Sequence, residues 1–179
     1  MVSNRKRSIN MSKPTPRNNE KILSSDDFIV SKTDTKGKII YGNKIFIQIS
    51  GYEEHELLGK PHSILRHPDM PKAIFKLLWE RLQAKKEIFA YVKNLCKDGS
   101  YYWVHANVTV TMDANDNIVD YHSVRRKPSR KSMEVIPGLY AQLLAEEKSG
   151  GMEASIRLLN KILEEKGMSY DDFIFDLQH

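Results

Sequence analysis

The chain is organised around one short run of residues, Leu65-Arg66-His67-Pro68-Asp69-Met70-Pro71. Its two prolines keep the residue before each ring out of the α-helical region of the backbone. The carboxylate of Asp69 can accept the free amide hydrogens of the helix that follows, and Pro71 fits inside the first turn of that helix. The run therefore predicts a loop anchored at a helix start, which holds Arg66 and His67 at the mouth of a pocket.

One long helix and three strands are expected after this loop. Residues 71–86 place large apolar side chains at helical spacing, with Trp79 on the flank of the buried stripe. The three strands are expected at residues 87–97, 101–112 and 118–125. The alternation along 101–112 turns Trp103 away from the pocket, where we expect either a partner or the chain's own tail to cover it.

A hairpin and two short helices are expected before the loop. Residues 27–41 predict the hairpin, with Gly37 in its turn, and residues 44–50 and 53–58 predict the helices. Taken with the later elements, this order predicts an α+β fold, in which a five-stranded antiparallel sheet carries helices on one face. A ligand can then bind between the two layers.

Both ends differ in character from the middle of the chain, residues 25–127. Residues 1–24 are polar and basic, so we expect a disordered tail, because such a segment buries too little apolar surface to offset the entropy of ordering. Residues 128–179 predict a helical C-terminal extension, with helices at 137–148, at 152–167 and from 170 onward. Ser169 caps the last helix, whose apolar side chains over 170–177 make it the expected interaction segment.

The composition bounds the class of protein. The chain has 179 residues, of which 40% are hydrophobic and 28% charged, as in ordinary soluble proteins. The net charge of +5 is concentrated in the first 25 residues and in residues 125–131, which we interpret as solvated, so no nucleic-acid partner is expected. Cys96 alone can form neither a disulfide framework nor a thiolate metal cage. Without a signal-peptide core or a long apolar run, we expect a cytoplasmic protein.

The sequence patterns that usually carry catalysis are missing. The chain has no phosphate-cradling glycine loop, no HExxH and no paired metal ligands at helical spacing. Its six histidines form no ligand pattern. We therefore expect neither an enzyme nor a metal centre, and we assign no catalytic residue.

Several short runs carry a resemblance to a known family, namely Ile49–Tyr52, Leu58–His62, Leu65–Pro71, Val92–Asn94, Lys97–Gly99 and Tyr102–Val104. On these runs, residues 27–127 resemble a PAS sensor domain. Within that superfamily they resemble the flavin-binding PAS domains of Aer-type energy-taxis receptors, and the stand-alone PAS partner of CetA/CetB-type bipartite receptors. The run from Arg66 to Pro71 is specific to the Aer type, whereas the Gly-Tyr, Asp-Gly and Tyr-Trp pieces occur in any PAS domain.

The resemblance implies a cofactor, FAD, bound noncovalently between sheet and helices, with its redox state as the signal. By position, Arg66, His67 and Asp69 match the loop that this family needs for flavin retention. Asn94 matches the strand asparagine whose amide pairs with the donor and acceptor edge of the isoalloxazine ring. The cofactor contacts implied by the resemblance therefore come from the loop before the long helix and from the strand after it.

The chain departs from its relatives at two places. Ile88 stands where these domains usually carry a tryptophan beside the flavin, and strict alternation points the adjacent Phe89 to the other face. The loop before the long helix also lacks the reactive cysteine of LOV-type photosensors, since Cys96 lies on a strand, so no photo-adduct is expected. We expect Trp79 to pack in the core or at the rim of the flavin site.

Three hypotheses for the function follow. The first is a redox sensor that binds FAD and passes its state to a separate chain, a transmembrane receptor of the methyl-accepting chemotaxis type, through which it would reach the membrane; a homodimer stays open. The second is a haem-binding gas sensor with His67 or His62 as the axial ligand. The third is a cofactor-free interaction or adaptor domain with Ile88 filling the pocket. We place the FAD sensor first.

Overall fold

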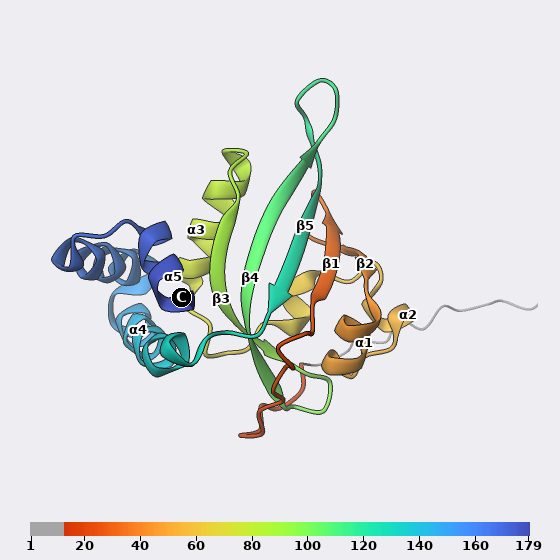
Figure 1. Ribbon diagram of the computed structural model, residues 1–179, viewed down its shortest axis with the longest axis horizontal. Coiled ribbons are helices and arrows are strands. Elements are labelled where there is room, and N and C mark those ends of the chain that lie inside the picture. Colours follow the sequence, from red (N-terminus) through yellow and green to blue (C-terminus); the bar gives the residue numbers. More distant parts are fainter. Residues whose placement is uncertain (1–12) are drawn as a thin grey trace, which may run out of the picture.

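Five antiparallel strands form a single sheet in the computed structural model, which describes residues 13–179 (Figure 1). The strands are β1 (Ile29–Asp34), β2 (Ile39–Gly42), β3 (Ile88–Leu95), β4 (Tyr101–Met112) and β5 (Ile118–Arg126). Their order across the sheet is β2-β1-β5-β4-β3, so β5, the last strand in the chain, pairs with β1, the first. This arrangement confirms the α+β fold, and each strand lies within two residues of its predicted bounds.

Four helical segments connect β2 to β3 and cover one face of the sheet, which we call the inner face. They are α1 (Lys44–Ser50), α2 (Glu54–Leu57), the 3₁₀ helix η1 (His62–Leu65) and α3 (Lys72–Gln83). The side chain of Asn43 starts α1 by accepting a hydrogen bond from the N–H of Phe46 at 3.0 Å. Because the side chains of a strand alternate, every second residue of β1, β3, β4 and β5 faces these helices.

The predicted cap of α3 is wrong. The N-cap position of α3 is Pro71, which has no side-chain hydrogen bond to the helix. Asp69 lies two residues earlier, and its carboxylate instead forms an ion pair with Lys93 of β3 at 2.7 Å. The N–H of Ala73 in the first turn donates to Glu147, which comes from the C-terminal extension, at 3.0 Å. The cap is therefore supplied by a distant part of the chain.

The C-terminal extension consists of α4 (Arg130–Lys166) and α5 (Tyr170–Gln178). The side chain of Ser129, just before α4, caps that helix, and α4 bends at Gly151, where φ is 72°. Only glycine adopts that backbone conformation readily, and the bend falls where the sequence predicts a break between two helices. Ser169 caps α5 as predicted. No helix within residues 13–179 is long and apolar enough to cross a membrane.

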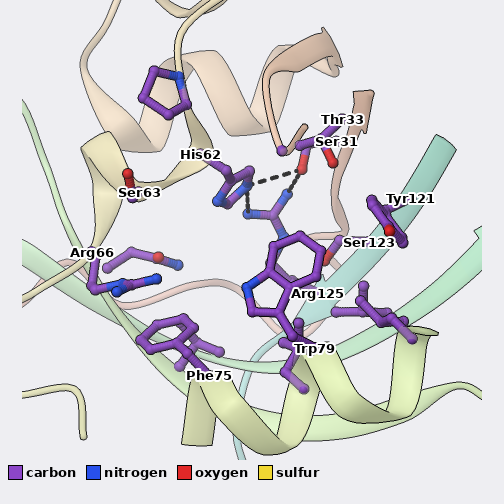
Figure 2. Close-up of a pocket in the computed structure, with 18 of the residues that line it drawn as sticks. Ser31, Thr33, His62, Ser63, Arg66, Phe75, Trp79, Tyr121, Ser123 and Arg125 are labelled. Atoms are coloured by element: carbon purple, nitrogen blue, oxygen red, sulfur yellow. Dashed lines mark hydrogen bonds between the residues drawn. The ribbon is translucent and has the colours of Figure 1, made fainter. Parts of the chain in front are cut away.

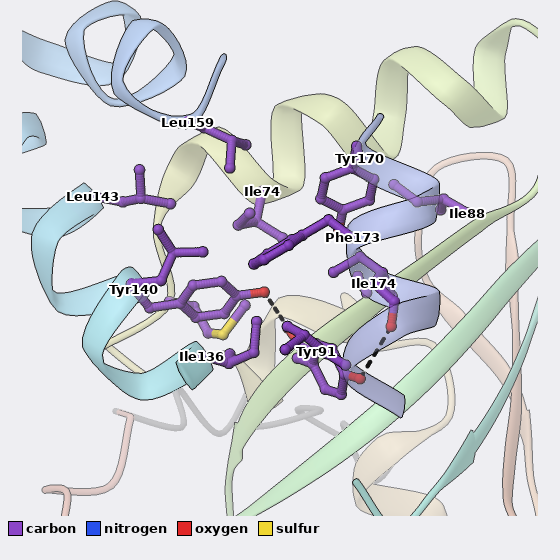
Figure 3. Packing of buried hydrophobic residues seen from close by; sticks show 14 of the residues in the cluster. Ile74, Ile88, Tyr91, Ile136, Tyr140, Leu143, Leu159, Tyr170, Phe173 and Ile174 are labelled. Carbon is purple, nitrogen blue, oxygen red and sulfur yellow. Dashed lines mark hydrogen bonds between the residues drawn. The ribbon is translucent and has the colours of Figure 1, made fainter. Parts of the chain in front are cut away.

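The extension packs on α3, on the edge of β3 and on the outer face of the sheet (Figures 1 and 3). Trp103, on the outer face, is only 9% exposed, and its ring centroid lies 5.9 Å from that of Tyr140 in α4. The hydroxyl of Tyr140 donates to the carbonyl of Tyr91 at 2.7 Å, and the hydroxyl of Tyr91 donates to the carbonyl of Ile174 in α5 at 3.3 Å. The chain's own tail therefore covers Trp103.

The apolar side chains of α5 are committed to this internal packing. The buried residues of the helix are Tyr170, Phe173, Ile174 and Leu177, whereas Phe175 is 65% exposed. The segment that the sequence marks as an interaction surface therefore makes its interactions within the chain.

The basic N-terminal tail is ordered where the structure describes it, which corrects the expectation of disorder for residues 13–24. The N–H of Tyr101 donates to the carbonyl of Asn19 at 2.9 Å, and the N–H of Lys21 donates to the carbonyl of Tyr101 at 2.7 Å. Leu23 is buried against the inner-face core. Backbone pairing with the start of β4 and this one buried leucine hold the segment. The rest of the predicted tail, residues 1–12, lies outside the described residues.

Candidate ligand-binding site

A cavity of about 320 Å³ lies between the inner face of the sheet and the helices (Figure 2). One wall is apolar, with side chains from α3 and from the central strands: Phe75, Leu78, Trp79, Leu82, Val92, Ala106 and Val108. The other parts of the lining are polar or cationic: Ser31, Thr33, Lys36, His62, Ser63, Arg66, Asn94, Tyr121, Ser123 and Arg125. An apolar slot with a few convergent polar groups is the usual form of a small-molecule site.

Arg66 and Asn94 come together at the edge of this cavity. An isolated antiparallel β-bridge pairs the backbone of Arg66, just after η1, with that of Asn94 on β3. The guanidinium carbon of Arg66 lies 3.7 Å from the centroid of the Phe75 ring. Within the described residues, neither Nε of Arg66 nor Nδ2 of Asn94 has a hydrogen-bond partner, although both atoms are buried. Each unpaired group costs about 1–3 kcal/mol, which a hydrogen-bonding partner in the cavity would recover.

A second polar group in the cavity consists of Ser31, His62 and Arg125 (Figure 2). Nε2 of His62 lies 3.3 Å from Oγ of Ser31 and 3.5 Å from Nη1 of Arg125. The second terminal nitrogen of Arg125 donates to Oγ of Ser31. Burial, and after it the charge on Arg125, lowers the pKa of His62 to about 3. His62 is therefore neutral at physiological pH, and Nε2 accepts hydrogen bonds.

Arg125 is a site residue that the sequence analysis misses. We expected it in a solvated basic run, but it is only 2% exposed and projects into the cavity. The signal was present in the strand period, because Tyr121, Ser123 and Arg125 alternate on one face of β5. Its neighbour Arg126 is exposed, as expected.

Trp79 also lines the cavity, from α3. Its ring meets that of Tyr121 edge-on, with centroids 5.2 Å apart and an interplanar angle of 80°. The indole therefore has one side against the sheet and another toward the cavity.

His67 and Asp69 belong to the same loop as Arg66 but do not line the cavity. Nδ1 of His67 accepts the N–H of Asp69 at 3.1 Å, and its ring meets the ring of Tyr101 at 5.7 Å. Burial, and after it the charge on Lys93, lowers the pKa of His67 to about 4. The carboxylate of Asp69 forms its ion pair with Lys93. These two residues hold the loop against β3, while Arg66 of the same loop faces inward.

Ile88 is fully buried but lies outside the cavity lining. It pairs with Val108 across β3 and β4 and joins the cluster formed by α3 and the C-terminal helices (Figure 3). Phe89 points to the opposite face, as predicted, where its ring stacks on His105 at 5.5 Å. The isoleucine therefore does not fill the cavity.

The two histidines considered as metal ligands are placed differently. His62 faces the cavity with Nε2 engaged by Ser31 and Arg125, whereas His67 faces away from it. No group of three or more His, Cys, Asp or Glu side chains within residues 13–179 is arranged to hold a metal ion.

The chain is similar to a family model, to a receptor and to a regulatory protein. Residues 39–125 match the family model described as PAS fold. The aerotaxis receptor of Escherichia coli (strain K12) is 39% identical over 127 residues, which are 71% of this chain and 25% of the receptor. The nitrogen fixation regulatory protein of Klebsiella oxytoca is 26% identical over 97 residues, which are 54% of this chain and 20% of that protein. The chain thus spans about a quarter or less of the length of these relatives.

Solved structures show the same fold. The light-state structure of the blue-light photoreceptor Aureochrome1 LOV has a TM-score of 0.51 and 25% identity, and the match covers 70% of this chain and 93% of that one. A structure titled for a flavin analogue in a light-oxygen-voltage domain has a TM-score of 0.53 and 24% identity, covering 68% of this chain and 87% of that one. With its sheet order and its match over residues 39–125, this part of the chain is a PAS domain.

Proposed function

We propose that this PAS domain binds a flavin, FAD, in the cavity between sheet and helices and serves as a redox sensor for energy taxis. The observation that carries the proposal is the pair of unpaired polar atoms at the cavity edge, Nδ2 of Asn94 and Nε of Arg66. The unpaired atoms support a bound ligand, and the similarity to the aerotaxis receptor supports the kind of signal.

The residues present fit a flavin. Its ring system is flat and apolar on both faces and carries donors and acceptors along one edge, which suits a slot with Phe75 and Trp79 on one wall. The amide of Asn94 can both donate and accept at that edge, and Arg66 can donate. A bound flavin supplies a ring that is reduced and reoxidised reversibly. A volume of about 320 Å³ is near the lower end for small-molecule sites, so we place the ring system inside and the rest of the dinucleotide toward the mouth.

The helix that lines the cavity also carries the C-terminal extension, which gives a route for the signal. Phe75 and Trp79 of α3 face the cavity. From the same helix, Lys76 pairs with Glu153 of α4 at 3.0 Å, and Arg81 pairs with Asp171 of α5 at 2.8 Å. A change at the cavity that moves α3 therefore changes contacts with both helices. We propose that a separate transmembrane chemoreceptor-type chain detects this change.

An absorption spectrum of the freshly purified protein tests the cofactor, followed by heat release and chromatography of any chromophore. We expect flavin bands that bleach with dithionite, and released FAD. A colourless protein that refuses added FAD contradicts the proposal. A Soret band contradicts it as well, and would direct attention to His62, the histidine that faces the cavity.

A further inference from the structure

Arg125 carries a positive charge that no described acidic residue around it neutralises. The guanidinium is buried, and burial lowers its pKa only to about 10, so it stays protonated at neutral pH. Among the described residues that line the cavity there is no aspartate or glutamate. Its hydrogen-bond partners are the hydroxyl of Ser31 and the neutral imidazole of His62. Nε of Arg125 has no partner within residues 13–179.

Burying an uncompensated charge costs desolvation free energy, and the contacts around Arg125 offset only part of it. The guanidinium carbon lies 4.9 Å from the centroid of the Phe46 ring, which provides a cation–π contact. Neutral hydrogen bonds and one aromatic face do not replace the water that the guanidinium loses. An apolar side chain of similar length at this position would avoid the cost altogether. The placement of an arginine here is explained if another group supplies the missing negative charge.

We infer that Arg125, supported by Ser31 and His62, is the counter-ion for a negative charge carried by the ligand of the cavity. The guanidinium lines the cavity and presents its fixed fork of donors beside a neutral acceptor pair. The identity of the ligand as a flavin nucleotide rests on the proposed function. In that case the negative charge has two sources, the phosphate of the nucleotide, which is charged in both redox states, and the ring, which gains charge on reduction.

Three variants test the inference. Arg125→Met removes the charge and keeps much of the length, Arg125→Lys keeps the charge without the fork, and Arg126→Met is the matched control on an exposed neighbour. Each apoprotein is titrated with riboflavin, FMN and FAD, and the midpoint potential of each loaded protein is measured. A separate thermal-melting series without flavin compares inorganic phosphate with chloride at equal ionic strength.

If Arg125 contacts the phosphate, Arg125→Met weakens the binding of FMN and FAD by about 10- to 150-fold and leaves the binding of riboflavin unchanged, since a hydrogen bond to a charged group is worth about 1.5–3 kcal/mol. If Arg125 contacts the ring, Arg125→Met changes the affinities for riboflavin, FMN and FAD by the same factor. The midpoint potential then falls by about 30 mV for each tenfold loss of preference for the reduced form. Either result supports the inference, with Arg125→Lys intermediate and Arg126→Met like the wild type. Unchanged affinities together with an unchanged potential in Arg125→Met overturn it.

Failure of the proposed function is distinguishable from failure of this inference. If the wild type binds no flavin, the proposed function fails and the melting series decides the inference. Phosphate that raises the melting temperature of the wild type and of Arg126→Met, but not of Arg125→Met, then supports an anion site. No effect of phosphate on the wild type in that case overturns it. A cooperative melt of Arg125→Met in chloride shows that the variant is folded.

Discussion

The carboxylate of Glu147, in α4, accepts a hydrogen bond from the backbone N–H of Ala73, in the first turn of α3, at 3.0 Å. Pro71 at the N-cap provides no such acceptor, and a negative charge is favoured near the positive end of a helix dipole. The C-terminal extension therefore caps the helix whose other side lines the cavity. This contact ties the helix that lines the cavity to the C-terminal extension.

Removing this cap is expected to weaken the domain. Glu147→Ala leaves the N–H of Ala73 without its partner, and loss of a capping side chain costs about 1 kcal/mol. We expect the free energy of unfolding, measured with urea, to fall by about that amount. Glu146→Ala is the matched control, because Glu146 is exposed and its replacement by alanine changes the helix propensity by the same amount. Equal stability of the two variants would show that the cap is not formed in solution.

The docking of α5 on its own domain is tested by two neighbouring phenylalanines. Phe173 is buried in the cluster with α3 and Tyr140, whereas Phe175 is 65% exposed (Figure 3). Phe173→Ala leaves a cavity and is expected to cost about 3–5 kcal/mol of unfolding free energy. Phe175→Ala should cost at most about 0.5 kcal/mol, as for most surface changes. Similar small losses in both would mean that α5 is detached in solution and available to a partner.

The sheet could be predicted from the sequence because period-two alternation is a local signal. The same alternation predicts that Trp103 lies on the outer face and that Phe89 and Ile88 point to opposite faces of the sheet. Both positions are confirmed. Arg66 and Asn94, which the family resemblance singles out, and Trp79, which the helical period places on the flank of the long helix, all line the cavity. The strand and helix positions share one property, since each depends on residues close together in the chain.

The features that could not be predicted depend on contacts between distant segments. Glu147 caps a helix 74 residues earlier, and no local pattern pairs the two. The strand period of β5 places Arg125 on the inner face, but residues 125–131 have the composition of a solvated basic run. Pairing beside Ile29 and Ala106 buries the side chain. Residues 13–24 have a composition typical of disorder, yet Tyr101 provides backbone partners for them. In each case tertiary contacts decide against the local signal.

The stability of the ligand-free protein is expected to fall in acid partly through His62. Its pKa is about 3 in the folded protein, because of burial and the charge on Arg125, against about 6.5 in the unfolded chain. Since the unfolded state binds the proton more readily, stability is lost as the pH falls from about 6.5 toward 3. We expect His62→Gln to show a shallower loss of urea resistance over this range than the wild type. Carboxylates contribute equally to both proteins, so identical profiles would contradict the burial of a neutral His62.

Asn94 is expected to affect ligand retention and not the stability of the ligand-free fold. Its Nδ2 has no partner within the described residues, so Asn94→Ala removes a buried polar group that costs free energy while it is unpaired. In the complex the change leaves the edge of the flavin unpaired, which corresponds to about 5- to 150-fold weaker binding. The measurement is the ratio of flavin to protein absorbance after purification, together with a titration of the apoprotein. Asn107→Ala is the control, since Nδ2 of Asn107 donates to Glu87 at 2.9 Å outside the cavity. Equal flavin content in the two variants would mean that Asn94 does not contact the cofactor.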